Sequence, residues 1–140
     1  MAHQTDPQAD ADYHAFLDAL ARQGLPRRAE AARATEAVAC ALALRLRDPH
    51  FDPLRELLPG PLKGRLLPCE RHGAGPPRMI AGLDGFLDVV AEDLGSSRMA
   101  AEPYARAVFG AMRSQLLESE EEEVARRLPG DLAPLWILTS

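Results

Sequence analysis

The chain lacks most of the features that narrow a protein to a known chemistry. Its 140 residues include two cysteines, Cys40 and Cys69, which are too few for a disulfide framework. Nothing at the N-terminus has the basic-then-apolar form of a signal peptide. No apolar run approaches the roughly 18 residues of a membrane span. We therefore expect a reduced, cytoplasmic protein with no membrane partner.

Basic residues are outnumbered by acidic ones, and lysine is nearly absent. The formal net charge is −5, and Lys63 is the single lysine beside fifteen arginines. Residues 71–140 contain seven basic and eleven acidic groups, a net charge of −4, against nine and ten, a net of −1, in residues 1–70. Duplex binding depends on a basic face that neutralises phosphates. The sequence therefore predicts no nucleic-acid partner, and it places the acidity in the second half.

What the chain does contain is a pattern repeated at a fixed offset of seventy positions, and a repeat is the first feature to look for in a sequence. The matches with the most information are Phe16-Leu17-Asp18 with Phe86-Leu87-Asp88 and Leu58-Pro59-Gly60-x-Leu62 with Leu128-Pro129-Gly130-x-Leu132. We predict two repeats, residues 13–67 and 83–137, joined by a glycine- and proline-rich linker over 68–79. Because 140 residues suit one core, both repeats are expected within a single domain, 1–140.

Apolar residues at three- and four-residue spacing predict a helical bundle in which each repeat has two long and two short helices. One ridge is Ala34, Val38, Leu42 and Leu46, and its equivalent is Tyr104, Val108, Met112 and Leu116. The predicted fold class is all-α, with two tandem pseudo-symmetric four-helix units packed into one compact helical domain.

Prolines and polar residues suggest where several helices begin. Pro26 is expected in the first turn of the second helix, because a helix tolerates proline there. Ser96 or Ser97 is expected to cap the long helix of the second repeat. Pro103 would remove a backbone bond from the interior of that helix, so regular helix is expected to begin near Glu102, after a separate turn, or to kink there. Ser119 followed by Glu122 has the spacing of a capping box.

The order of these helices, ending in Leu128-Pro-Gly-Asp131-Leu132-x-x-Leu135-Trp136, resembles the bacterial domain-of-unknown-function family 2267. The resemblance covers about residues 11–137 and fits the second repeat better, because Pro61 stands in the first repeat where the second has an acid. It implies a small all-helical protein with two such units. The family has no assigned activity, so the resemblance leaves the function open.

Candidate chemistry is sparse. Cys69-x-x-His72 has the spacing of half a zinc site, but the other two ligands of a closed site are missing. Cys69 as a nucleophile with His72 as its base lacks a third group. We therefore predict no catalytic, cofactor-binding or metal-binding residues, and no cofactor.

Three acidic features have both a structural and a functional interpretation. Asp18 and Asp88 could be acid–base carboxylates, but their repetition favours a shared structural role, such as bonding to a neighbouring helix end. The glutamates from Glu118 to Glu123 could hold a cation or dock a basic partner, although such a run is usually a solvated helix start. The candidate interaction surface consists of Glu120, Glu121 and Glu123, which we expect to be exposed on the first turn of their helix.

Two hypotheses for function remain. The first is a non-enzymatic protein-interaction module, whose partner is another protein or a second copy of the chain. The alternative is a small enzyme or ligand carrier with a pocket between the repeats, lined by Asp88, Tyr104 or His14. Trp136 closes the second repeat and is expected to be buried.

Overall fold

The computed structural model describes residues 7–47, 49–58, 60 and 82–136, and no strand occurs among them. The all-α prediction is therefore confirmed for this part of the chain. The last short helix of the first repeat and the linker over 68–79, with Cys69 and His72, lie outside the described residues. The helices are α1 (Pro7–Arg22), α2 (Arg28–Arg45), η1 (Pro49–Phe51), α3 (Asp52–Leu57), α6 (Gly82–Leu94), α7 (Arg98–Ser114), α8 (Glu118–Arg127), η2 (Gly130–Leu132) and α9 (Ala133–Trp136).

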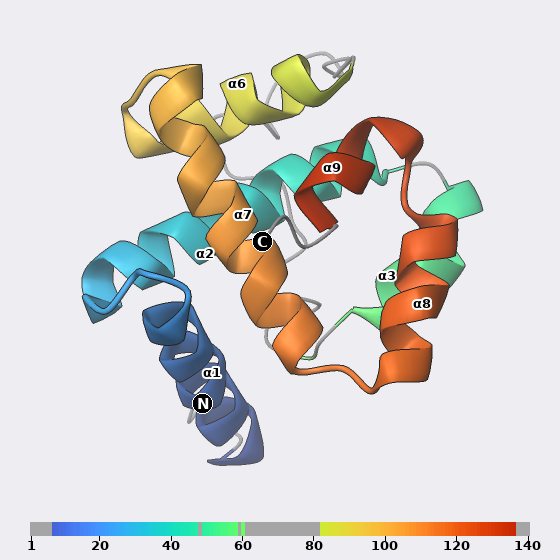
Figure 1. Ribbon diagram of the computed structural model, residues 1–140, viewed down its shortest axis with the longest axis horizontal. Coiled ribbons are helices and arrows are strands. Elements are labelled where there is room, and N and C mark those ends of the chain that lie inside the picture. Colours follow the sequence, from blue (N-terminus) through green and yellow to red (C-terminus); the bar gives the residue numbers. More distant parts are fainter. Residues whose placement is uncertain (1–6, 48, 59, 61–81, 137–140) are drawn as a thin grey trace, which may run out of the picture.

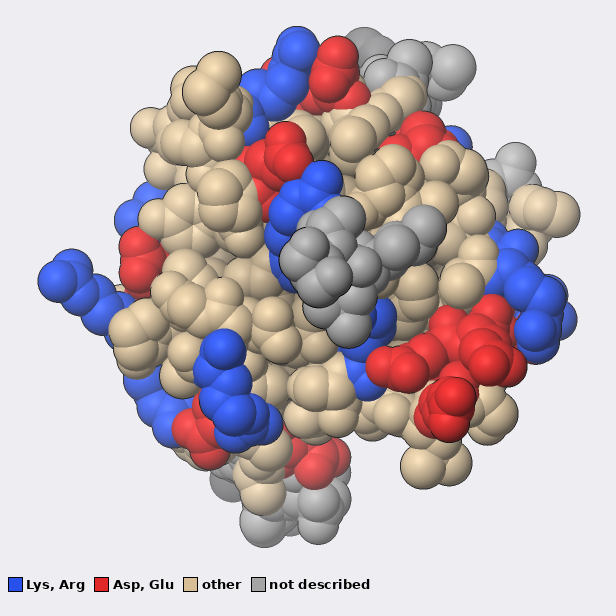
Figure 2. Space-filling view, in the orientation of Figure 1, with Lys and Arg blue, Asp and Glu red and all other residues tan. Residues whose placement is uncertain are grey.

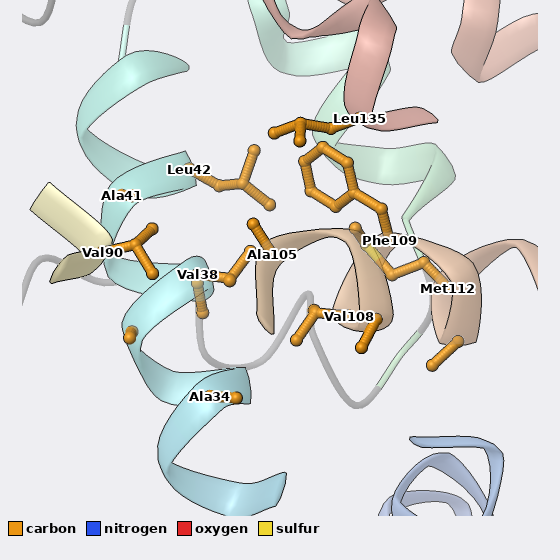
Figure 3. Close-up of a cluster of buried hydrophobic side chains, with 14 of the residues drawn as sticks. Ala34, Val38, Ala41, Leu42, Val90, Ala105, Val108, Phe109, Met112 and Leu135 are labelled. Atoms are coloured by element: carbon orange, nitrogen blue, oxygen red, sulfur yellow. The ribbon is translucent and has the colours of Figure 1, made fainter. Parts of the chain in front are cut away.

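The two long helices, α2 and α7, cross at the centre of the molecule (Figure 1). All but three residues of α2 between Ala31 and Leu44 are buried, as expected of a helix that is covered on nearly every side. Figure 3 shows Ala34, Val38 and Leu42 on α2 pointing toward α7. There they meet Ala105, Val108, Phe109 and Met112, so the predicted ridge forms part of the core.

The other helices pack against this pair or against one another. α1 contacts both α2 and α7, and α6 likewise contacts both α2 and α7. α3 packs against α8, and α9 packs against α7. Two aromatic contacts connect α6 and α9 to α7. The centroid of the Phe109 ring lies 6.1 Å from that of Phe86 and 6.2 Å from that of Trp136. Trp136 is 5% exposed, so its predicted burial is confirmed.

α1 and α6 end in the same motif. Gly24 and Gly95 adopt positive φ angles of 106° and 65°, and a backbone N–H bonds back across each turn, from Leu25 to the Leu20 carbonyl and from Ser96 to the Ala91 carbonyl, both at 2.9 Å. These glycines are 71 positions apart, whereas the arginines that begin α2 and α7 are 70 apart. The two turns therefore differ in length by one residue.

The structure differs from the sequence expectation at the start of α2 and at Pro103, whereas the predicted serine cap of α7 is confirmed. α2 begins at Arg28, so Pro26 lies before the helix and not in its first turn. α7 begins at Arg98, capped by the Ser97 side chain, which accepts from the Ala100 N–H at 3.1 Å, and it continues through Pro103 without interruption. The Ser97 cap and the buried Ala101 offset the bond that Pro103 cannot donate.

Candidate functional site

The repeated aspartates, Asp18 and Asp88, each hold the arginine that begins the next long helix. Arg28 Nη2 donates to Asp18 Oδ1 at 2.6 Å, and Arg98 donates to both Asp88 oxygens at 2.8 and 3.0 Å. The hydrogen bond to Asp88 and the charge of Asp84 raise the pKa of Arg98. Both carboxylates therefore fix a helix–turn–helix junction, and the predicted shared structural role is confirmed.

The glutamates proposed as an interaction surface have structural contacts of their own. The Glu120 carboxylate accepts from the Leu117 backbone N–H at 2.8 Å, and this bond caps α8. The predicted capping box at Ser119 and Glu122 is wrong, since α8 begins one residue before Ser119. The Glu121 carbonyl accepts from the Trp136 indole N–H at 3.3 Å.

Glu123 accepts hydrogen bonds from Arg126 and Arg127 within the same helix. These hydrogen bonds lower the pKa of Glu123, Arg126 contributing more than Arg127. Glu120, Glu121 and Glu123 are all half-buried, so the expectation that the three would be exposed is not met. Their part in binding a partner stays a prediction.

The exposed carboxylates of the run are Glu118 and Glu122, which lie one turn apart on α8. Neither side chain pairs with any described residue. Leu117 precedes them and is 70% exposed. Figure 2 shows the acidic side chains gathered at the lower right, over the start of α8. We call Leu117, Glu118 and Glu122 the α8 surface.

Arg113 lies in the last turn of α7. Its Nε atom is buried and has no hydrogen-bond partner. Burial lowers the pKa of Arg113, and the nearby charge of Glu121 opposes that shift. The Glu121 carboxylate thus compensates a half-buried cation, which gives it a role inside the protein.

A pocket of about 300 Å³ lies between the turn that joins α1 to α2 and the first half of α7. Tyr104 lines it, and the tyrosine hydroxyl donates to Glu30 Oε2 at 2.7 Å. This hydrogen bond is the main cause that raises the pKa of Tyr104. Asp88 lines a second pocket of about 490 Å³, between α6 and α7, whereas His14 is exposed and lines neither. Both pockets are open to solvent.

Comparison with known protein families assigns this chain to one of them. A family described as an uncharacterized conserved protein (DUF2267) matches residues 13–135. The chain belongs to this family. A comparison with curated proteins finds no match.

In this DUF2267 protein, the Leu-Pro-Gly-Asp-Leu segment also makes a contact that sequence reasoning missed. Arg45, at the end of α2, donates to Asp131 Oδ1 at 2.9 Å and to Oδ2 at 3.2 Å. The guanidinium also lies 5.8 Å from the centre of the Phe51 ring. Seventy positions away from this pair the sequence has Gln115 and Pro61, so both partners of the ion pair are lost together there. The joint loss of both residues at the equivalent positions is the sequence signal that could have indicated the pairing of Arg45 with Asp131.

Two further findings concern the described part of the DUF2267 chain. No group of three or more His, Cys, Asp or Glu side chains in it could hold a metal ion. Nor is any of its helices both long and apolar enough to cross a membrane.

Proposed function

We propose that this DUF2267 protein is a non-enzymatic interaction module that docks a basic segment of another protein on the α8 surface. The observation that carries the proposal is a large exposed leucine beside two carboxylates that pair with no described residue. In the described part of the chain, Leu117 and Met99 are the exposed large hydrophobic residues. Only Leu117 adjoins unpaired charge of one sign.

The chemistry of the surface defines the partner. Glu118 and Glu122 can each accept from an arginine or lysine, and Leu117 offers an apolar contact between them and the turn after α7. An exposed ion pair contributes little alone, about 0.2–1 kcal/mol, so specificity requires both charges together with the apolar contact. Charge complementarity of this kind mainly speeds association and selects the partner. The partner we propose therefore has two basic side chains next to an apolar one.

The other carboxylates support a binding function over catalysis. Asp18 and Asp88, the acids at equivalent places, are held by arginines at helix junctions. Glu120 and Glu123 are bonded within or beside α8. These groups stabilise the scaffold, whereas Glu118 and Glu122 of the α8 surface are exposed and pair with no described residue.

We also propose that the scaffold is two tandem pseudo-symmetric units, residues 13–67 and 83–137. The matching ion pairs at the two junctions support it, as do the glycine-ended first helices. If the two units are equivalent, α1 corresponds to α6 and α2 corresponds to α7. The contact of α2 with α6 then corresponds to the contact of α7 with α1, and both contacts are present. The α8 surface is not duplicated, because Arg47 takes the place of Leu117 in the first unit.

The test is site-specific crosslinking in the native host. A photo-crosslinking amino acid replaces Leu117, and the control places it at Met99, which is 85% exposed on α7. We expect a protein crosslinked from position 117 alone, and we expect Glu118→Gln/Glu122→Gln to remove it. Asp52→Asn, at the position equivalent to Glu122, should leave it unchanged. Equal crosslinking from both positions, none from position 117, or a product with a second copy of this chain would overturn the proposal.

A further inference from the structure

The pocket lined by Tyr104 has a counterpart at the other helix–turn–helix junction. A second pocket of about 210 Å³ is lined by Arg33, Glu36, Ala37 and Asp93. Three of these residues lie seventy positions from residues of the first pocket: Asp93 from Gln23, Arg33 from Pro103 and Ala37 from Ala107. We call the two the Tyr104 pocket and the Asp93 pocket. They occupy matching places, each between a helix–turn–helix junction and the other long helix.

The chemistry of the two pockets differs. The Asp93 pocket has charges of both signs, and its Arg33 donates to the Leu94 carbonyl at 3.4 Å. Glu30 is the one charged residue that lines the Tyr104 pocket, among mainly small or apolar neighbours. Arg33, one turn further along α2, acts on Tyr104 through its charge but does not line this pocket. The residue seventy positions before Tyr104 is Ala34, so an aromatic ring is present in one copy only.

Tyr104 is held in place at the wall of its pocket. Its hydroxyl bonds one oxygen of Glu30, Oε2, while Oε1 accepts no hydrogen bond from a described side chain. Leu25, Pro103 and Ala107 supply an apolar lining. The pocket lining thus combines a carboxylate with one oxygen that accepts no hydrogen bond from a described side chain, a tyrosine held by its hydroxyl and apolar residues.

We propose that the Tyr104 pocket binds a small organic cation, a protonated amine with a short apolar body. The carboxylate would accept from the ammonium group, and the tyrosine ring would attract the same charge through its electron-rich face. The volume lies at the lower end of the roughly 300–1,000 Å³ of ligand pockets, which limits the ligand to a few heavy atoms. An anion of the same shape is repelled by Glu30, and a neutral molecule gains nothing from the charge.

The test uses three molecules of one shape on the full chain: isopentylamine, isopentanol and isovalerate. Backbone amide shifts are followed by NMR as each is added. We expect isopentylamine to shift the amides around Tyr104 and Glu30 saturably, at concentrations where the alcohol and the acid do not. Equal shifts from the amine and the alcohol would overturn the proposal, and so would no saturable shift from the amine.

Variants locate the site. Tyr104→Ala introduces the residue found at the equivalent position of the first repeat, and Glu30→Gln removes the charge. Each variant should lower the affinity for isopentylamine by about tenfold or more, because it loses a contact to a charged group. Asp93→Asn, in the Asp93 pocket, is the matched control and should bind as the parent does. Circular dichroism confirms that each variant is folded. If Asp93→Asn weakened binding as much as Glu30→Gln, the response would reflect overall charge and the proposal would fail. Crosslinking from the α8 surface should be unaffected by Tyr104→Ala, so this site and the proposed docking surface can fail independently.

Discussion

Replacing Trp136 by alanine should strongly destabilise the protein. The side chain is 5% exposed, packs edge-on against Phe109, and donates its indole N–H to the Glu121 carbonyl. An aromatic residue buries about 150–250 Å², which at roughly 25 cal/mol per Å² corresponds to about 4–6 kcal/mol. Large aromatic truncations in cores cost about 3–5 kcal/mol, which agrees with that estimate.

The assay is thermal and urea unfolding followed by circular dichroism. For a chain of this length a loss of this size lowers Tm by about 10–20 °C. Trp136→Phe is the matched control: it keeps a ring against Phe109 and loses the indole hydrogen bond, so it should cost about 1–2 kcal/mol. If Trp136→Ala melted within a few degrees of the parent, α9 would not be docked on α7 and the packing described above would be wrong.

Three further predictions test the scaffold. A double-mutant cycle with Arg45→Gln and Asp131→Asn should give a coupling of about 1 kcal/mol, above most exposed pairs because the side chains are only 24% and 21% exposed; a coupling near zero would show that the contact adds nothing. Gly95→Ala should lower the free energy of unfolding by about 1 kcal/mol because of its φ of 65°, and an unchanged urea midpoint would contradict this. The lowered pKa of Glu123 means that its contribution to stability is present above the ordinary carboxyl value of 4.5 and is lost as pH falls through its folded pKa; the Tm of Glu123→Gln should therefore approach that of the parent in acid, and a gap that stayed constant would refute it.

The sequence was sufficient for the all-helical class and for the buried ridge of α2, because helical periodicity acts locally. Ala34, Val38 and Leu42 recur every four residues, and all three are buried as that spacing implies. Helix starts were harder. Proline rules favour the first turn, but at Pro103 the Ser97 cap and the buried Ala101 set the start five residues earlier.

The exposure of the acidic run was predicted for the wrong residues, because Glu120, Glu121 and Glu123 are half-buried whereas Glu118 and Glu122 are exposed. Five glutamates within 118–123 allow more than one capping pattern, and Leu117 with Glu120 has the same spacing as Ser119 with Glu122. The buried Val124 resolves the choice, since residues three and four positions before it share its face of α8. That rule places Glu120 and Glu121 toward the protein.

Contacts between distant residues were beyond reach from local patterns. Arg45 and Asp131 are 86 positions apart, and nothing local in either segment selects the other. The same holds for Tyr104 and Glu30, which are 74 apart. Such pairs depend on how helices cross, which periodicity alone does not fix.

The most direct measurement is the salt dependence of binding between this protein and the partner crosslinked from position 117. Titration calorimetry from low to high ionic strength should show an affinity that falls steeply for the parent, because exposed charges are screened beyond about 10 Å at 0.1 M salt. For Glu118→Gln/Glu122→Gln the affinity should be lower at low salt and nearly independent of salt. An affinity that is insensitive to salt in the parent, or equal slopes for the two proteins, would contradict an acidic docking surface on α8.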